Sequence, residues 1–346
     1  MKVLHLLSTN KFSGAENVVC QIINLFQNES NYKMFYCSPD GEIKETLKNK
    51  NIDFVPIKSL TYKELKKVVK NIKPDIIHAH DIKASILASL FYNKCEIISH
   101  IHGNSLEMRK VSIKSLLYLI CSKRFKHIFW VSSSCFVDYK YSIKVESKSS
   151  ILVNVIDTQR INELAKEKGT IDSYDVIYVG RLVQLKNPLR MIKIFENVCK
   201  EKCNAKLAII GNGVMFNEVQ EYITNHDLKN NIDLLGFKNN PYKYIFKSKM
   251  MILTSIYEGT PMCVLEAMAL GKPIISTPTD GLVDLIKQDY NGFLSDKDEE
   301  LEAAIISLIN DQEKLSRMSK NVIKEFNRFN DIEKYKNEIK NKYEME

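Results

Sequence analysis

Short apolar runs alternate with amphipathic segments along most of the chain, and this alternation is the feature that most limits the fold. The apolar runs predict buried strands, and the segments with apolar residues three and four apart predict helices. Buried strands that alternate with helices form parallel sheets, because each parallel connection needs a crossover. The 346 residues, of which 45% are hydrophobic, are too many for one ordinary domain. The sequence therefore predicts an α/β protein with two doubly wound domains.

The predicted elements divide into two similar halves. Strands of the first half are expected at 3–7, 33–37, 54–55, 75–78, 96–101, 127–131 and 150–153. Strands of the second half are expected at 176–179, 206–210, 232–235, 250–254 and 273–276. Helices are expected at 188–200, 214–226, 261–270, 299–310, 312–329 and 331–343. The polar stretch 157–175 has few large apolar residues and is interpreted as the linker, so the predicted domains are 1–157 and 158–330.

Cysteine usage and hydropathy indicate the compartment. The eight cysteines include no C-x-x-C pair, which is typical of a reducing compartment. The apolar run at residues 1–8 is too short for a signal peptide, and no stretch approaches 18 uninterrupted apolar residues. We expect a cytoplasmic protein whose membrane contact is peripheral, on the inner face of the plasma membrane.

The positive charge is unevenly distributed. Residues 1–157 carry 23 Lys and Arg against 14 Asp and Glu, a net charge of +9, whereas residues 158–346 carry 27 against 28. Such asymmetry suggests that the first half faces an anionic partner, either a membrane surface or nucleic acid.

The densest chemical signal lies at residues 253–273, after a predicted strand. Thr260 is expected to cap the helix 261–270, and Pro261 suits its first position. The backbone N–H groups of residues 260–263 would then form an anion site at the positive end of the helix dipole. Glu266 would lie about 9 Å further along, within reach of the ribose of a bound nucleoside diphosphate. Glu258 precedes the helix, where a donor sugar would be; the alternative is a capped surface helix with both glutamates solvated.

A second motif, residues 180–188, follows the predicted strand 176–179. It places Arg181 at the end of that strand and Lys186 just before a helix that Pro188 begins. Two fixed cations suit a diphosphate leaving group, which they would neutralise as a metal does. The alternative interpretation is a solvated basic loop.

Together the two motifs resemble family 4 of the retaining glycosyltransferases. The match consists of Glu258-x7-Glu266 with Gly259, Pro261 and the Glu-Ala-Met-Ala run, and of Gly-Arg-Leu-x3-Lys-Asn-Pro at 180–188. It implies the GT-B fold, in which two Rossmann-like domains face a central cleft and the final helix, about 331–346, crosses back to domain 1–157. It also implies that the nucleotide-sugar lies mainly on the C-terminal domain and the acceptor on the N-terminal one.

The resemblance assigns roles to individual residues. Gly14, in a segment similar to the family's Gly-Gly-x-Glu loop, would let its N–H approach the diphosphate. His102 would contact the donor sugar, Gly211 lies in a turn near the nucleotide, and the segment with Phe237 and Lys238 would read the base with its backbone. The implied catalytic residues are His102, Arg181, Lys186 and Glu258. The implied donor-nucleotide residues are Gly14, Gly180, Arg181, Lys186, Gly211, Phe237, Lys238, Gly259, Thr260, Pro261, Met262 and Glu266.

Two departures from the family pattern stand beside these matches. Val155 occupies a position where the interdomain motif usually has glycine, which affects the hinge. Thr260 stands where a bulkier residue is frequent, close to the expected sugar pocket. The family pattern therefore does not identify the donor sugar.

Two histidine pairs and two short motifs are candidates for other sites. His78-x-His80 and His100-x-His102 each place two imidazoles on one face of a strand, a spacing compatible with a metal. No cysteine or carboxylate completes a ligand set nearby, so we expect neither a metal nor another cofactor. The D-x-D at 296–298 precedes a predicted helix and is interpreted as capping acid. The chain lacks a G-x-G-x-x-G after a strand, which argues against a dinucleotide-dependent dehydrogenase.

Residues 109–126 carry six basic residues and no acidic one: Arg109, Lys110, Lys114, Lys123, Arg124 and Lys126. An apolar stripe at helical spacing accompanies them, formed by Ile113, Leu116, Leu117 and Ile120. This pattern predicts a basic amphipathic helix that lies on an anionic membrane. The alternative is a helix whose stripe packs on the sheet while its lysines are solvated, and the sequence leaves both open. No nucleic-acid-binding motif is present, so nucleic acid is not expected as a partner.

The expected activity follows from the resemblance. We expect a retaining, metal-independent glycosyltransferase that moves a sugar from a nucleotide diphosphate, with UDP the expected nucleotide, to a glycan or lipid-linked glycan. Such an enzyme would serve in cell-surface polysaccharide or glycoconjugate synthesis. The alternative is a catalytically silent module of the same fold that docks on a membrane or nucleic acid through its basic half.

Overall fold

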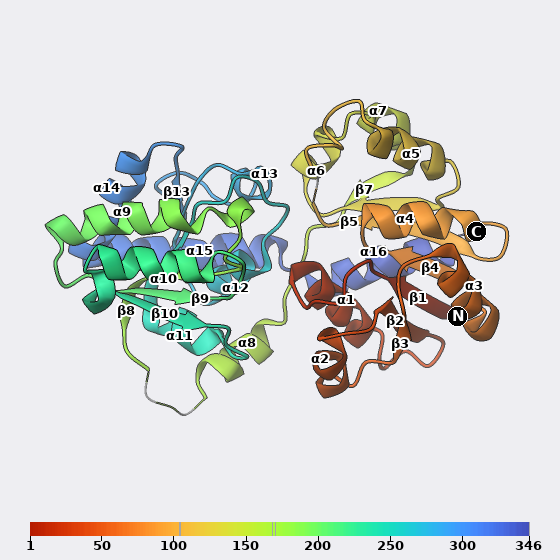
Figure 1. Cartoon of the computed structure of the whole chain (residues 1–346), viewed down its shortest axis with the longest axis horizontal. Coiled ribbons are helices and arrows are strands. Elements are labelled where there is room, and N and C mark those ends of the chain that lie inside the picture. Colours follow the sequence, from red (N-terminus) through yellow and green to blue (C-terminus); the bar gives the residue numbers. More distant parts are fainter. Residues whose placement is uncertain (104, 168, 170, 346) are drawn as a thin grey trace. The chain divides into compact units, whose positions relative to one another are not determined.

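The computed structural model describes residues 1–103, 105–167, 169 and 171–345, and it divides the chain into two compact units (Figure 1). Unit 1 consists of Met1–Asn154 together with Ile332–Glu346, and unit 2 of Val155–Asp331. Glu346, the last residue of the predicted terminal helix range, lies outside the described residues. Both units contain a parallel sheet with helices, so the predicted α/β fold is confirmed.

Unit 1 is built on a seven-stranded parallel sheet of order β3-β2-β1-β4-β5-β6-β7. Its strands are β1 Lys2–Leu6, β2 Lys33–Pro39, β3 Phe54–Ile57, β4 Ile76–Ala79, β5 Glu96–Ile101, β6 His127–Trp130 and β7 Ser149–Ile151. Its helices are α1 Gly14–Leu25, α2 Ile43–Asn49, α3 Tyr62–Ile72, α4 Ile82–Ala88, α5 Ile113–Ser122, α6 Ser133–Val137, α7 Ser142–Val145 and α16 Ile332–Glu344. The strand order reverses between β1 and β4, the kind of position where open parallel sheets bind ligands.

The terminal helix α16 is part of unit 1, as the fold prediction requires. It buries Tyr335, Ile339 and Tyr343. The ring of Tyr343 packs against Phe26, at the C-cap of α1, and Lys336 pairs with Glu29 at 2.7 Å. The apolar and aromatic side chains at every fourth position explain why this lysine-rich helix packs rather than remains solvated.

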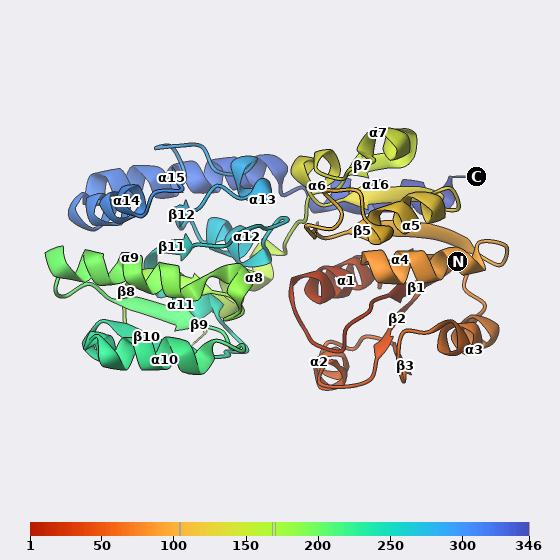
Figure 2. The same ribbon diagram turned by 45° about the horizontal axis from the view of Figure 1, so that its top comes forward.

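Unit 2 has a six-stranded parallel sheet of order β10-β9-β8-β11-β12-β13. Its strands are β8 Tyr174–Val179, β9 Leu207–Ile210, β10 Ile232–Gly236, β11 Ser248–Leu253, β12 Ile274–Ser276 and β13 Gly292–Leu294. Its helices are α8 Thr158–Ala165, α9 Pro188–Glu201, α10 Phe216–Asn225, α11 Tyr242–Lys247, α12 Met262–Ala269, α13 Asp280–Val283, α14 Asp298–Asn310 and α15 Gln312–Phe329. Figure 2 shows α10 and α15 toward opposite edges of this unit. The order reverses between β8 and β11.

The polar stretch 157–175 differs from its interpretation as a linker. Its first part forms α8, because the Asp157 carboxylate accepts the N–H of Arg160 at 3.0 Å and caps the helix. Ile161 and Ala165 are buried, and α8 packs on α11 and α12 within unit 2. Two apolar side chains are enough to dock a short helix, but too few to reveal it in the sequence.

None of the helices in the described ranges has both the length and the apolar content needed to cross a membrane.

Candidate active site

Three strand-end loops of unit 2 are joined by their backbones. Gly180, after β8, donates its N–H to the carbonyl of Ile210 at 3.0 Å, and Gly211, after β9, donates to the carbonyl of Gly236 at 3.0 Å. A Cβ on Gly211 would lie 1.8 Å from the Gly180 oxygen, and the φ angle of Gly211 is +148°. Only glycine permits this approach. The segments predicted at 180, 211 and 236–238 therefore form one loop cluster at the carboxyl edge of the sheet.

The loop after β11 packs against the start of α13. A Cβ on Gly281 would lie 1.5 Å from the carbonyl oxygen of Gly259 and 3.1 Å from the nitrogen of Thr260. Thr277, after β12, donates its hydroxyl to the carbonyl of Ser255 at 2.8 Å. The loop that carries Glu258 is thus held from the neighbouring strand end, and neither Gly281 nor Thr277 was singled out in the sequence.

Lys186 and Glu258 form an ion pair that joins the two predicted motifs. The Lys186 ammonium donates to Oε1 of Glu258, and the Ser255 hydroxyl donates to the same oxygen at 2.6 Å. The two charged side chains are only 15% and 9% exposed. Backbone contacts support the pair, since Ile256 donates its N–H to the carbonyl of Leu185 at 2.9 Å. The motifs lie 72 residues apart in the chain, so the sequence did not predict this pairing.

Arg181 differs from Lys186 in its surroundings. It is exposed at the carboxyl end of β8, and its carbonyl oxygen accepts the hydroxyl of Tyr178 at 3.0 Å. Within the described ranges no ion pair to Arg181 is found. The carboxyl edge of the sheet thus has one cation that is paired with a carboxylate, Lys186, and one cation that is exposed, Arg181.

The start of α12 corrects one prediction. Pro261, not Thr260, is the N-cap, and the helix begins at Met262. Pro261 has an extended ψ of 124°, and its carbonyl accepts the N–H groups of Val264 and Leu265 at 3.1 and 3.3 Å. Because proline has no N–H, the predicted anion site at 260–263 loses one donor, and the first helical N–H groups are those of Met262 and Cys263.

Glu266 is the fifth residue of α12, about 6 Å along the axis from Met262. It is buried, and its Oε1 accepts the hydroxyl of Tyr242 from α11 at 3.2 Å. Burial, with the Glu266 carboxylate beside it, raises the pKa of Tyr242. Burial also raises the pKa of the Cys263 thiol to about 12. Sequence reasoning missed Tyr242, because a tyrosine 24 residues before a glutamate carries no motif.

His102 follows β5 in unit 1 and belongs to a cluster of five histidines, called here the histidine cluster: His5, His78, His80, His100 and His102. Adjacent strands bring the two predicted histidine pairs together, and the pairing of His5 with His78 between β1 and β4 adds a fifth ring. Burial lowers the pKa of all five, to about 3 for His5 and His102. The cluster is therefore neutral at physiological pH.

The loop that carries Gly14 lies at the point where the strand order of unit 1 reverses. Gly14 begins α1, and the N-cap Ser13 donates its hydroxyl to Glu16. Asp81, which caps α4, accepts the N–H of Ser8 at 2.8 Å. Glu16 is buried, and burial raises the pKa of its carboxyl. The loop is thereby tied to the end of β4.

Part of the basic segment, Ile113–Ser122, forms α5, and its apolar stripe does not pack on the sheet. Of the six basic residues only Lys114 lies within the helix, so the other five flank it. The helix instead buries Ser115, Tyr118, Cys121 and Ser122. The stripe residues Ile113, Leu116, Leu117 and Ile120 are between 40% and 81% exposed. The interpretation in which the stripe faces the sheet is therefore wrong, because small and polar side chains with one tyrosine make the packed face.

Three of the six basic residues are paired within unit 1. Arg109 pairs with Asp138 at 3.2 Å, Lys114 with Glu107 at 2.9 Å and Lys126 with Glu96 at 2.6 Å. Arg124 lies over the ring of Tyr92 at 4.7 Å. Lys110 and Lys123 are exposed.

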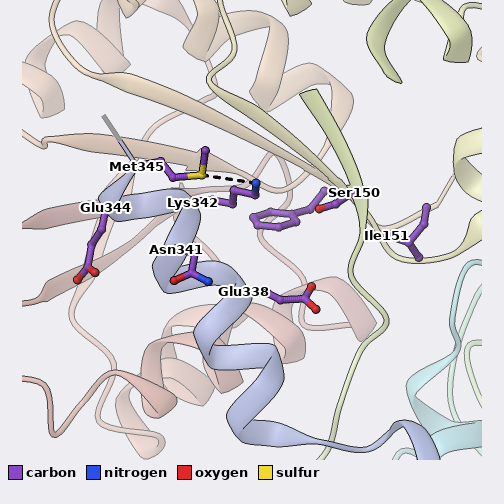
Figure 3. Close-up of a pocket in the computed structure, with 8 residues that line it drawn as sticks. Ser150, Ile151, Glu338, Asn341, Lys342, Glu344 and Met345 are labelled. Carbon is purple, nitrogen blue, oxygen red and sulfur yellow. Dashed lines mark hydrogen bonds between the residues drawn. The ribbon is translucent and has the colours of Figure 1, made fainter. Parts of the chain in front are cut away.

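A hollow elsewhere on unit 1 is not lined by any predicted site residue. It lies beside α16 and is lined by Phe129, Ser150, Ile151, Glu338, Asn341, Lys342, Glu344 and Met345. Figure 3 shows Lys342 and Met345 on its rim, where the ammonium donates to the methionine sulfur at 3.6 Å. It is widely open, and we assign no role to it.

Known proteins resemble both units. Residues 160–325 match the family described as Glycosyl transferases group 1, and residues 6–134 match Glycosyl transferase 4-like. An uncharacterized glycosyltransferase of Methanocaldococcus jannaschii is 32% identical over 283 residues, which cover 72% of this chain and 68% of that protein. The chain belongs to the group 1 glycosyltransferases. This confirms the resemblance on which the sequence prediction rested.

Two further known proteins are similar to this chain over nearly their whole length and nearly its whole length. The Escherichia coli UDP-Gal:alpha-D-GlcNAc-diphosphoundecaprenol alpha-1,3-galactosyltransferase is 26% identical over 378 residues, covering 97% of this chain and 96% of that one. The crystal structure of Anabaena HepE in complex with UDP-glucose has a TM-score of 0.84 at 20% identity and covers 98% of both chains. The latter likeness confirms the GT-B fold.

Proposed function

We propose that this glycosyltransferase transfers a sugar from a UDP-sugar to a glycan or lipid-linked glycan with retention of configuration and without a metal ion. The observation that carries the proposal is the Lys186–Glu258 pair, which holds a cation and a carboxylate together in strand-end loops of the sheet whose strand β8 is followed by the exposed Arg181. The names of the similar proteins support the substrates, since one acts with UDP-Gal on a diphosphoundecaprenol-linked sugar and another binds UDP-glucose.

The leaving diphosphate is the group that Arg181 and Lys186 would stabilise. A Lys ammonium has three N–H donors, so Lys186 can keep Glu258 while it donates to a phosphate oxygen. The N–H groups of Met262 and Cys263 at the positive end of α12 would add donors. These fixed positive groups supply the charge neutralisation that a metal gives in other enzymes.

The donor sugar is assigned to Glu258 and His102 and the ribose to Glu266, with Gly14 as a further diphosphate donor. Glu258 and His102 would position the sugar, while a phosphate oxygen of the leaving group accepts the acceptor's proton on the same face. The nucleotide is assigned to the loop cluster at Gly180, Gly211, Phe237 and Lys238, and to the loop at Gly259, Thr260 and Pro261. Phe237, which is 69% exposed, offers an apolar surface there.

Release of free UDP from a panel of UDP-sugars tests this function. Arg181→Gln should lower turnover at least 100-fold, because a transition-state cation is lost. Lys193→Gln, an exposed position in α9, is the control and should leave turnover unchanged. Turnover of Arg181→Gln within a few-fold of the parent would refute the proposal. If the parent protein neither binds UDP in calorimetry nor releases UDP from any sugar nucleotide, the catalytically silent module would be favoured.

We also propose that the enzyme attaches to the anionic inner surface of the plasma membrane through α5, as a cytoplasmic, peripheral protein. The exposed stripe Ile113, Leu116, Leu117 and Ile120 supplies apolar side chains, and Lys110, Lys123 and Arg124 supply flanking charge. Each stripe residue would gain about 1 kcal/mol on partial burial. Each cation near an anionic surface adds about 1 kcal/mol, which makes the binding sensitive to salt.

Co-sedimentation with vesicles that contain phosphatidylglycerol tests the attachment. The double variant Ile113→Ser and Ile120→Ser should lose most of the binding. Val214→Ser removes an even more exposed apolar side chain from unit 2 and should not change the binding. Binding of both proteins to the same extent would contradict the assignment to α5.

A further inference from the structure

The histidine cluster contains five of the seven histidines in the chain, and the proposed function uses only His102. Two hydrogen bonds connect three of the rings into a chain. His80 Nδ1 lies 3.0 Å from His102 Nε2, and His80 Nε2 lies 2.9 Å from His5 Nδ1. His80 is buried between the other two rings, in contact with one through each of its nitrogens.

The other two rings of the cluster lie outside this hydrogen-bonded chain of three rings. His78 Nδ1 is hydrogen-bonded to the hydroxyl of Tyr343 at 2.7 Å, and its ring stacks on His80 with centroids 4.3 Å apart. His100 stacks on His102 at 4.2 Å, and neither of its nitrogens has a hydrogen-bond partner in the described part of the chain. His78 and His100 therefore pack around the three-ring chain but, among the described residues, form no hydrogen bond with it.

The contacts within the chain fit hydrogen bonds better than a shared metal ion. Nitrogens of neighbouring rings come close enough to be candidates for metal ligands. In a tetrahedral site, however, two nitrogens about 2.0 Å from the metal lie roughly 3.3 Å apart and both point at the ion. The nitrogens of His80 instead face one nitrogen each of His5 and His102 at 2.9 and 3.0 Å. An N–H donor between each pair explains that spacing.

The three neutral rings must change tautomer together. A neutral imidazole carries one N–H, so each ring donates at one nitrogen and accepts at the other. If His5 donates to His80 and His80 donates to His102, then His102 carries its proton on Nδ1. If the direction reverses, His102 donates from Nε2, and its Nδ1 becomes an acceptor. The free ends of the chain are His102 Nδ1 and His5 Nε2, both buried and unpartnered among the described residues.

We propose that His80 is a positioning residue that sets the ring orientation and the protonated nitrogen of His102 through the chain His5–His80–His102. This inference rests on the proposed function, in which His102 contacts the donor sugar. In the first arrangement His5 and His80 also carry their protons on Nδ1, and the protonated Nδ1 of His102 is buried, so the donor meets the exposed part of this half-buried ring rather than Nδ1. The contact with His80 then holds the His102 ring in one orientation, which needs no reorganisation during transfer.

Two substitutions of the same residue separate the links. In His80→Asn the side-chain amide lies near the position of Nδ1, so it retains a partner for His102 and loses the contact with His5. In His80→Gln the amide reaches the position of Nε2, so it retains the contact with His5 and leaves His102 without its partner. We expect kcat for the UDP-sugar to remain within about three-fold in His80→Asn and to fall about ten-fold or more in His80→Gln, with KM nearly unchanged.

His78→Asn is the matched control, because His78 lies two residues before His80 and is equally buried but bonds to Tyr343. It should lose stability in urea while its kcat stays near that of the parent. Equal kcat in the Asn and Gln variants of His80, both near the parent value, would overturn the proposal.

Nitrogen NMR of protein labelled with 15N-histidine tests the chain without any turnover. We expect His5, His80 and His102 to be neutral at pH 7 and to carry their protons on the same type of nitrogen. His80→Gln should move the ring signals of His102, whereas His78→Asn should not. Mixed, independent tautomers, a charged His102, or a metal ion retained on these rings after dialysis against chelator would overturn the proposal. If no UDP-sugar is turned over, the proposed function fails, while the NMR result still decides the chain.

Discussion

The ion pair between Lys186 and Glu258 should stabilise unit 2, although neither residue belongs to its hydrophobic core. The side chains are 15% and 9% exposed, so water screens their attraction weakly. At a charge separation of about 4 Å and an effective dielectric constant near 20, the Coulomb attraction is about 4 kcal/mol. Desolvation of both groups offsets much of this. Removal of one partner from a fully buried pair costs about 3–5 kcal/mol, because the remaining charge is left uncompensated.

Because both side chains keep some exposure to water, we expect a smaller loss of stability than this when one partner is removed. We predict that Glu258→Gln and Lys186→Met each reduce the free energy of unfolding of unit 2 by about 2–3 kcal/mol. The double variant should lose less than the sum of the two, with a coupling energy of about 1–3 kcal/mol. Glu258→Gln leaves Ser255 a hydrogen-bond acceptor, so the loss in that variant reports mainly on the charge.

Hydrogen exchange of peptides from β8 and β11 in increasing urea measures the stability of unit 2 directly. The single tryptophan, Trp130, lies in β6 of unit 1, so its fluorescence follows the other unit in the same samples. A coupling energy below about 0.5 kcal/mol would refute the reasoning, since that is the value of an exposed pair. The same conclusion would follow if 1 M salt removed the coupling, because salt screens exposed pairs far more than buried ones.

Three further perturbations have defined outcomes. Gly281→Ala should weaken UDP binding at least ten-fold in calorimetry, because its Cβ would meet the Gly259 carbonyl 1.5 Å away and displace the loop; unchanged affinity would contradict this. Tyr242→Phe removes the hydrogen bond to Glu266 and should lower the free energy of unfolding of unit 2 by about 1 kcal/mol, measured in urea, and raise the Kd for UDP in calorimetry because Glu266 is held less firmly. Acid should destabilise unit 1. His5 and His102 have folded pKa values of about 3, whereas unfolded histidine titrates near 6.5. Between these values the unfolded state binds more protons, so this stability is present above pH 6.5 and is lost as pH falls, by about 1 kcal/mol per histidine at pH 5.5. The urea midpoint of Trp130 fluorescence at pH 7.5 and 5.5 measures it, and equal midpoints would exclude the effect.

The sequence predicted most of the strands because burial on both faces leaves a clear apolar pattern in parallel strands. It missed β13, which has only three residues. It also predicted that Arg181, Lys186 and Glu258 follow strands, and the structure has them in strand-end loops of one sheet. Their roles toward a donor remain predictions. The pairing of Lys186 with Glu258 was not predictable, since it depends on which strands are neighbours.

Local capping and side-chain orientation were harder to predict. The expected cap at Thr260 was wrong because the extended ψ of Pro261 moved the helix start by one residue. The stripe on α5 fitted either a core or a membrane interpretation, and only the burial of Tyr118 shows which face packs inward. His5 carried no motif by itself, and it became part of a cluster only through the pairing of β1 with β4.

The place of α16 in the chain has a consequence for synthesis. Unit 1 is completed by a helix that follows all of unit 2 in sequence, and the hydroxyl of Tyr343 in that helix caps His78 of the histidine cluster. A ribosome therefore synthesises the whole of unit 2 before α16 can complete unit 1. Until then, the buried histidine face and the apolar residues under α16 remain open to water and to chaperones. The segment that begins at the N-terminus is thus the last to mature, and early termination anywhere before residue 332 would leave it incomplete.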